Sequence, residues 1–319
     1  MKRLIVMMLG GAKRVSIARM IAEACERRGI EPVMASYELR EDEPIATVAK
    51  VVKGLKWNDP GVSDHIIEAL RSMGTPEDSY AVIPFVDGSI EIAARLSQEN
   101  DWIYSPTSDT EKSKALFDKV ESATLFEQHG LPVPATIDDI DPIYPLIAKP
   151  RKGSASKGIK IVRSEADLPK ENGSDYLLQE LIEPADEYTA DCFISQEGEI
   201  LAISPRKRID IAGGEVTRSV TIDYPKLKTL SSTVITRLGL KGAVTIQWIE
   251  RRGSGDPLLM EINPRLGGGA VCSVHAGADL PGFIVDEATG KKPLPTAEIQ
   301  PNVEIARYFQ EVVFKHIPQ

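Results

Sequence analysis

The residues best suited to chemistry in this chain end an apolar run, at Glu261-Ile262-Asn263. The pattern from Leu258 to Ile262 predicts a buried strand, in which residues two apart point to the same face. The Glu261 carboxylate and the Asn263 amide oxygen would then lie side by side. Such hard oxygen ligands suit Mg²⁺ or Mn²⁺ bridging nucleotide phosphates better than they suit zinc. In the alternative interpretation, the segment is only a strand end with a solvated glutamate and a turn-favouring asparagine.

The residues around this pair strengthen the prediction of an anion site. Pro264 is expected to stop the strand, Arg265 adds a fixed cation, and Gly267-Gly268-Gly269 let backbone approach a ligand closely. Gln247 is a polar residue in the preceding apolar run, 242–249. If the two runs form a hairpin across a turn at 251–256, Gln247 lies opposite the Glu261 region and could direct its amide at the same ion.

A second chemical segment is a loop rich in glycine, serine and lysine between the apolar runs 146–149 and 159–162. It is not a Walker loop, because the Lys-Ser/Thr pair and the following helix are missing. A strand–loop–strand hairpin can still lay backbone N–H groups and polar side chains over phosphates. The candidates are Gly153, Ser154, Ser156, Lys157 and Gly158. Lys149, inside the apolar run, must reach solvent or meet an anion; the alternative is a basic surface hairpin.

A third group consists of basic residues that flank Gly213-Gly214. Arg206, Lys207 and Arg208 precede this turn and Arg218 follows it. Arg208 or Arg218 could clamp a substrate carboxylate in bidentate fashion, or they could belong to a solvated basic strand end, which is the favoured interpretation for Lys207. The four histidines are scattered, and no Ser-His-Asp or Cys-His set indicates a protein nucleophile.

The first hundred residues alternate strand and helix patterns, which predicts a parallel sheet covered on both faces. Strands are expected at 4–9, 32–36, 80–86 and 102–104, and helices at 16–28, 63–73 and 89–96. The turn at Gly10-Gly11 lacks the G-x-G-x-x-G pattern, so no dinucleotide site is expected there. Asp87 lies at the carboxyl end of a predicted strand, where it could contact a ligand or only cap the following helix.

A boundary is expected near Ser105-Pro106-Thr107, followed by a polar helical stretch through Lys119 that ends near Gly130. Beyond the basic loop, the pattern predicts strands at 176–182, 187–194, 199–205, 242–249 and 258–262, and a helix at 225–238. At 319 residues the chain suits two or three packed units.

Composition excludes several classes of function. A net charge of −9 argues against nucleic acid as the main partner. No stretch approaches the ~18–20 apolar residues of a membrane span. The three cysteines are far apart in sequence, which is typical of a reducing compartment. The protein is therefore expected in the cytoplasm, without a nucleic acid or membrane partner.

Together these segments resemble the ATP-grasp superfamily, and most closely the ATP-binding halves of carbamoyl phosphate synthase large subunits. The resemblance covers nearly the whole chain and rests on motifs in the family's order. They are Asp118-Lys119 before G-L-P-V-P, L-I-A-K-P with G-S-A-S-K-G-I, Q-E-L-I at 179–182, Glu187, and Gln247 with Glu261-Ile262-Asn263. The chain is far shorter than a complete synthase large subunit and holds one copy of the unit, so the synthase's own reaction is not expected.

The resemblance implies a role for each matching residue. Lys119 and Lys149 would contact phosphates, and the Gly153–Gly158 hairpin would close over them. Adenine would be held by Gln179, Glu180, Leu181 and Ile182, and the ribose hydroxyls by Glu187. Gln247, Glu261 and Asn263 would bind the metal, and Arg265 the substrate or a phosphate.

The implied fold is α/β: a Rossmann-like domain with a parallel sheet at 1–105, then a two-lobed ATP-grasp domain at 106–319. Its small lid lobe would span about 118–183 and its large lobe about 184–319. The implied activity is ligation of a small carboxylate to an amine or ammonia with Mg-ATP, and a homodimer is one assembly that the resemblance allows. The alternatives are an ATP-binding subunit of a split synthase, a nucleotide-sensing module, or a kinase that releases a stable phosphorylated product.

Overall fold

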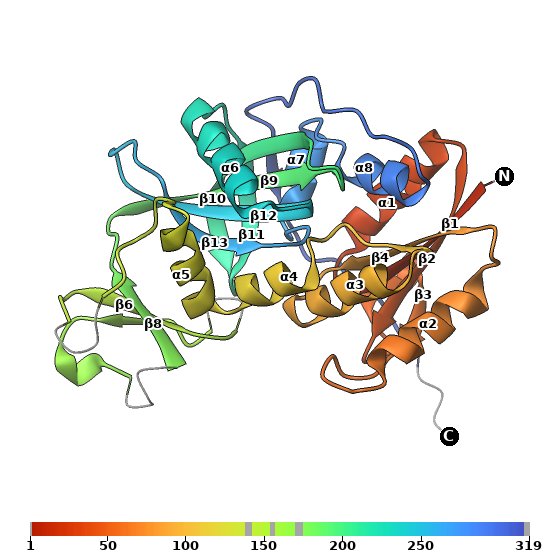
Figure 1. Ribbon diagram of the computed structural model, residues 1–319, viewed down its shortest axis with the longest axis horizontal. Coiled ribbons are helices and arrows are strands. Elements are labelled where there is room, and N and C mark those ends of the chain that lie inside the picture. Colours follow the sequence, from red (N-terminus) through yellow and green to blue (C-terminus); the bar gives the residue numbers. More distant parts are fainter. Residues whose placement is uncertain (1, 138–141, 154–156, 170–174, 316–319) are drawn as a thin grey trace.

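The computed structural model of the protein describes residues 2–137, 142–153, 157–169 and 175–315. These residues form three sheets of five, three and six strands, which we call the N-terminal sheet, the small sheet and the large sheet. The N-terminal and small sheets lie at opposite ends of the molecule, with the large sheet between them (Figure 1).

The N-terminal sheet is parallel throughout, with the order β3-β2-β1-β4-β5. Its strands are β1 (Lys2–Leu9), β2 (Ile30–Glu38), β3 (Lys50–Lys53), β4 (Ser79–Pro84) and β5 (Ile103–Tyr104). The connecting helices are α1 (Val15–Arg27), the 3₁₀ turn η1 (Pro44–Thr47), α2 (Val62–Met73) and α3 (Asp87–Glu99). This arrangement confirms the predicted parallel α/β sheet; the short β3 was not predicted.

The two faces of this sheet are covered from different parts of the chain. In β1, Ile5, Met7 and Leu9 pack against α2 and α3. The β1 residues that alternate with these point to the other face. There they pack against α1 and also against α8 (Leu280–Ala288), which comes from the far end of the sequence. Figure 1 shows α8 beside α1 on this face. The division expected near residue 105 therefore separates the sheets but not their hydrophobic cores.

The polar helical stretch after the N-terminal sheet consists of two helices, α4 (Thr110–Phe117) and α5 (Lys119–Gln128). The chain breaks between them because Asp118 has an extended conformation and caps α5, accepting hydrogen bonds from the amides of Val120 and Glu121. Antiparallel strands β6 (Leu146–Pro150), β7 (Lys160–Val162) and β8 (Tyr176–Glu180) then form the small sheet, with the 3₁₀ turn η2 (Glu165–Asp167) after β7.

The large sheet has the order β13-β12-β9-β10-β11-β14, and its neighbouring strands are antiparallel. Its strands are β9 (Ala185–Ile194), β10 (Ile200–Ala212), β11 (Glu215–Thr221), β12 (Gly242–Arg251), β13 (Leu258–Asn263) and β14 (Glu304–Ala306). One face buries Ala190, Ile246 and Trp248 against α6 (Pro225–Leu238). The short α7 (Ala270–His275) precedes α8.

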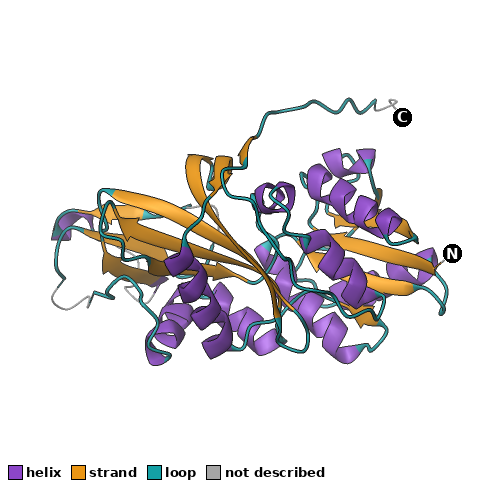
Figure 2. Ribbon diagram, turned by 90° about the horizontal axis from the view of Figure 1, so that it is seen from above, coloured by secondary structure: helices purple, strands orange, loops and turns teal. Residues whose placement is uncertain are grey.

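After β14 the chain runs away from the body of the molecule as an extended segment (Figure 2). Cys25, Cys192 and Cys272 are buried and form no disulfide. Among the described helices, none has the length and apolar character needed to cross a bilayer.

Candidate functional site

The face of the large sheet opposite α6 is polar. Along β9, Glu187, Thr189 and Asp191 alternate with Tyr188 and Ala190, so the polar residues share one face. The strand register extends this face sideways. Thr189 is paired with Gln247 on β12 and with Arg206 on β10, and Gln247 is paired in turn with Glu261 on β13.

The structure forms the β12–β13 hairpin that the sequence predicts, and it brings the proposed metal ligands together. Gln247 lies directly opposite Glu261, and Thr245 lies opposite Asn263. No group of three or more His, Cys, Asp or Glu side chains in the described part of the chain could hold a metal ion. The oxygen set here contains one carboxylate and two amides, which suits a Mg²⁺ ion that takes its remaining ligands from phosphates and water.

Lys149 reaches this face from the small sheet. Its side chain is buried (8% exposed), and its Nζ donates a hydrogen bond to Gln179 Oε1 at 2.7 Å. Burial lowers the pKa of Lys149 to about 8, while the nearby carboxylates of Glu261 and Glu187 oppose this shift. Lys119 lies close enough to lower the pKa further. The cation thus lies in a position where it lacks a full counter-charge and where an anionic ligand would supply one.

Lys119, at the start of α5, is joined to the loop after β6. Its Nζ donates to the Gly153 carbonyl at 2.8 Å, and its amide donates to the Arg151 carbonyl. Asp118, the α5 cap, forms an ion pair with Arg151 at 2.5 Å. Lys157 is exposed, and Gly158 has a φ of +78°, which favours glycine. Ser154 and Ser156 lie outside the described residues.

The segment expected to hold adenine, 179–182, spans the end of β8. The Gln179 amide nitrogen donates to the Pro134 carbonyl, so both ends of this side chain are engaged. Ile182 is buried and Leu181 half-buried. The amide and carboxylate of Glu180 bond to Ala135. Hydrogen bonds thus hold this strand end to residues 134–135, and Gln179 connects it to Lys149.

A cavity of about 210 Å³ adjoins the metal-ligand set, between the N-terminal and large sheets. Gln247 and Asn263 line it, whereas Glu261 and Lys149 lie outside its lining. Its charged lining residues are Arg14, Asp87, Arg206, Arg208, Glu215 and Arg265. Gly267, Gly268 and Gly269 complete one wall, and a Cβ at Gly268 would approach Arg14 Nη1 to 2.7 Å.

Each arginine of the cavity is held by a carboxylate. Arg265 binds Asp87 at 2.7 Å, which settles the position of Asp87: it makes no side-chain cap bond to α3 and crosses to the large sheet instead. Arg208 binds Glu187 at 2.8 Å, so two residues expected to serve different substrates lie in contact. Burial lowers the pKa of Arg208 below its usual value.

Two further arginine pairs were not predicted from the sequence. Arg206 and Asp191 form a buried ion pair at 2.8 Å, and the Ser273 hydroxyl donates to Asp191 at 2.7 Å. Arg14, from the loop after β1, binds Glu215 at 3.1 Å. The alternation of polar residues from 187 to 191 was the available signal for Thr189 and Asp191; no local pattern indicated Arg14.

The structure does not bring Arg218 to this cavity. Arg218 pairs with Asp210 in the β10–β11 register, whereas Arg208 pairs with Ser219, so the two arginines fall on alternate positions. Arg218 is half-exposed and forms an ion pair with Glu304 on β14. A carboxylate clamp that combines Arg208 with Arg218 is therefore inconsistent with the strand geometry.

Comparisons with known proteins agree with this geometry. The family described as "ATP-grasp in the biosynthetic pathway with Ter operon" matches residues 173–311. The carbamoyl phosphate synthase large chain of Bifidobacterium adolescentis is 23% identical over 181 residues, which cover 50% of this chain and only 16% of that protein.

Two solved structures cover almost the whole chain. N5-carboxyaminoimidazole ribonucleotide synthetase from Thermotoga maritima is 18% identical, with a TM-score of 0.68 over 94% of this chain and 78% of its own. The chain has the ATP-grasp fold. The biotin carboxylase domain of 2-oxoglutarate carboxylase from Hydrogenobacter thermophilus, a dimer solved with MgADP, ADP and bicarbonate, is 19% identical, with a TM-score of 0.73 over 95% of this chain and 73% of its own.

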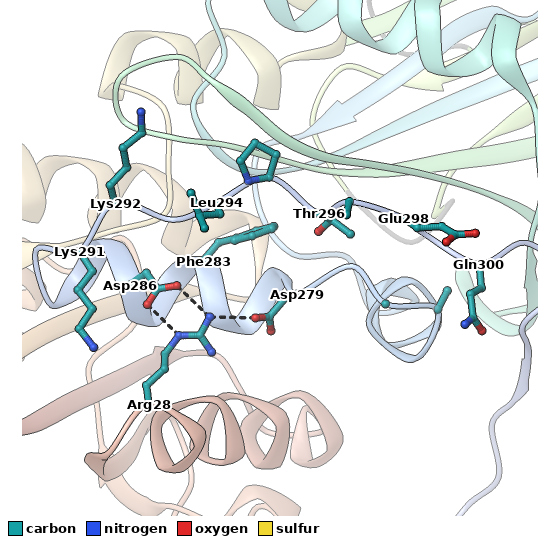
Figure 3. A pocket seen from close by; sticks show the side chains of 14 residues that line it. Arg28, Asp279, Phe283, Asp286, Lys291, Lys292, Leu294, Thr296, Glu298 and Gln300 are labelled. Atoms are coloured by element: carbon teal, nitrogen blue, oxygen red, sulfur yellow. Dashed lines mark hydrogen bonds and ion pairs between the residues drawn. The ribbon is translucent and has the colours of Figure 1, made fainter.

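A larger cavity of this ATP-grasp fold, about 710 Å³, lies away from these residues. Figure 3 shows Arg28, from the end of α1, pointing at two carboxylates of the α8 region. Its guanidinium bonds to Asp286 at 2.8 Å and to Asp279 at 2.9 Å. Because Arg28 is already paired with both acids, we assign it to the attachment of α1 to α8.

Proposed function

We propose that the protein is a Mg-ATP-dependent ligase, which activates a small carboxylate as an acyl phosphate and transfers the acyl group to an amine or ammonia. The observation that carries this proposal is the buried Lys149 cation beside Glu261, Gln247 and Asn263. A lysine ammonium group close to a set of oxygen ligands would be complementary to a nucleoside triphosphate and its metal ion.

The chemistry needs positioning and charge neutralisation more than it needs a protein nucleophile. A carboxylate is a poor acyl donor because its leaving group would be oxide, and phosphorylation supplies a better one. Lys119 and Lys149 would hold the phosphate oxygens, and Gln247, Glu261 and Asn263 would hold Mg²⁺, which supplies a bridging positive charge. The loop from Gly153 to Gly158 would cover the phosphates and exclude water.

The remaining residues would bind the adenosine part of ATP and the reacting carboxylate. The strand end at 179–182 would hold adenine against its apolar surface, and Glu187 would accept the ribose hydroxyls while it also holds Arg208. Arg265, fixed by Asp87, would face the reacting carboxylate. The 210 Å³ cavity borders Asn263 and Gln247 but not Lys149, so we place the carboxylate substrate in it.

A second candidate is an ATP-binding subunit of a split carbamoyl phosphate synthase-like assembly. The similarity to a segment of a carbamoyl phosphate synthase large chain favours it. ADP release by the purified chain alone, stimulated by a carboxylate and an amine together, would decide for the independent ligase.

The experiment combines this assay with a substitution. We expect Glu261→Gln to lower stimulated ADP release at least ~10-fold at saturating Mg²⁺, because it removes the one carboxylate of the ligand set at almost constant volume. Glu23→Gln, on the exposed side of α1, is the matched control. Full activity of Glu261→Gln would contradict the metal assignment, and an unchanged melting temperature on addition of Mg-ATP would contradict the nucleotide site.

A further inference from the structure

Thr189 is a buried hydroxyl that the folded chain leaves without a partner. Its side chain is 1% exposed, its Oγ1 has no hydrogen-bond partner among the described residues, and it lines the 210 Å³ cavity. A buried hydroxyl in this state costs free energy, so it requires an explanation. The strand register places it between Gln247, on the metal side, and Arg206, on the far side.

Arg206 and Arg14, which line the same cavity as Thr189, keep N–H donors for a further group. The Arg206 guanidinium donates hydrogen bonds to Asp191 through Nε and Nη2 and to Ser219 through Nη1. Arg14 gives two N–H groups to Glu215. Since a guanidinium carries five N–H donors, both arginines retain some of them at the cavity wall. A hydroxyl and two partly used arginines form a donor-rich pocket for an anion.

We propose that the carboxylate substrate is a small dicarboxylic acid, whose second carboxylate is bound by Thr189, Arg206 and Arg14. This inference rests on the proposed function, which places the reacting carboxylate beside Arg265 and Asn263. Gln247 and Arg206 are two strand spacings apart, roughly 10 Å between backbones, so one short molecule spans both ends once side chains fill part of this distance. Two planar guanidinium groups already shared with carboxylates suit another planar carboxylate.

The test measures ligand affinity by calorimetry, on protein saturated with a non-hydrolysable Mg-ATP analogue. The probes are succinate against butyrate and glutarate against valerate, which match in carbon number and differ in the second carboxylate. We expect at least one diacid to bind ~10-fold or more tightly than its monoacid, because its second carboxylate accepts further charge-assisted hydrogen bonds. Equal affinities within both pairs would overturn the proposal.

Two variants locate the second carboxylate. Thr189→Val should weaken diacid binding about 10-fold, leave monoacid binding unchanged, and maintain or raise the melting temperature of the free protein, because it removes an unsatisfied hydroxyl. Arg14→Gln should weaken diacid binding at least as much. Thr229→Val, on the solvent side of α6, and Arg19→Gln, exposed on α1, are the matched controls.

The outcomes separate this proposal from the function on which it rests. If the nucleotide analogue fails to raise the melting temperature, the ligase proposal fails. If the analogue binds but Thr189→Val retains full diacid affinity, only the diacid proposal fails. A Thr189→Val protein that loses diacid and monoacid binding equally also overturns it, because the hydroxyl would then act on the whole cavity and not on one carboxylate.

Discussion

Lys149 is buried as a cation beside a neutral glutamine, and this has a consequence for stability. Its pKa of about 8 lies below the value near 10.4 of an unfolded lysine. Below pH 8 the residue is charged in both states, and folding bears the full cost of burying the charge. As the pH rises from 8 to above 10 this cost disappears, because the unfolded chain then loses the same proton. The difference corresponds to roughly 3 kcal/mol.

We therefore predict that Lys149→Met changes stability in a pH-dependent way. The free energy of unfolding of the variant minus that of the wild type should be larger at pH 7 than at pH 10, by up to roughly 3 kcal/mol. The constant cost of leaving Gln179 Oε1 without its donor cancels in this comparison. Urea unfolding at both pH values measures it, with exposed Lys53→Met as the reference for the loss of one charge. A pH-independent difference would contradict the burial of a cation.

The ligand affinity of the same variant should fall. The phosphates of ATP would supply the counter-charge that Lys149 lacks in the free protein, so we expect the Mg-ATP-induced rise in melting temperature to shrink in Lys149→Met. NAD serves as the negative control. The buried Glu38 carboxylate accepts hydrogen bonds from the amides of Gly11 and Ala12, so these amides of the Gly10-Gly11 turn are not free for a pyrophosphate. Equal shifts with Mg-ATP in both proteins would contradict a phosphate role for Lys149.

Among individual site residues, the sequence predicted the polar ones that interrupt an apolar strand. Gln247, Lys149 and Glu261 are polar groups in apolar strands, and the structure places all three at one site. Arg206 and Thr189 were missed as site residues because their neighbours come from strands whose register no local pattern reveals. Arg14 was missed because its partner Glu215 is about 200 residues away in the sequence.

At the scale of elements, the N-terminus of α5 fixes the position of Lys119 through Asp118. Burial alone would raise the pKa of Asp118, but the hydrogen bond and charge of Arg151, together with the amides of Glu121 and Val120, outweigh it and lower the pKa. We predict that Asp118→Ala destabilises the fold by about 1–2 kcal/mol, the usual cost of a lost helix cap, and also weakens Mg-ATP binding, because Lys119 loses its support. Urea unfolding and nucleotide titration measure the two effects.

Asp109→Ala is the matched control for this prediction. Asp109 caps α4 in the same way, by accepting a hydrogen bond from the Lys112 amide, but it does not contact the loop after β6. We expect the control to lose similar stability and to keep its affinity for Mg-ATP. Equal losses of affinity in both variants would mean that general loosening, and not the position of Lys119, governs binding.

The sequence placed most elements correctly but misjudged where β10 ends. The strand was predicted to end at Pro205, and a solvated basic strand end was the favoured interpretation for Lys207. The strand continues to Ala212, since Arg206 meets Asp191 and Arg208 meets Glu187 on the neighbouring β9. Charge complementarity between paired strands is not visible in a local pattern of one strand. The strands β11 and β14 were not predicted.

At the scale of the whole molecule, the N-terminal and large sheets share one core through α8. Phe283 of α8 packs against Phe193 of β9, with ring centroids 5.3 Å apart. The same core includes Leu4 and Val6 of β1. Two sheets that share a core cannot lose their packing independently, so we expect both to unfold in one cooperative transition.

The three tryptophans make this expectation testable. Trp57 and Trp102 pack with the N-terminal sheet, and Trp248 is buried in the large sheet. In Trp248→Phe, the remaining tryptophans report on the N-terminal sheet. In the double variant Trp57→Phe/Trp102→Phe, the remaining tryptophan reports on the large sheet. Within each variant, we predict that the urea midpoints from fluorescence and from far-UV circular dichroism coincide. Separate midpoints would show that the regions unfold independently.

The origin of α8 also bears on the biosynthesis of the chain. The last strand of the N-terminal sheet ends at Tyr104, whereas α8 begins at Leu280, so about 175 residues must still be made before the second helix of this face exists. At ordinary translation rates this takes roughly 10 to 35 s. Throughout this interval a nascent chain exposes an apolar sheet face on the ribosome, and it becomes a natural client for a chaperone that shields the surface until α8 arrives.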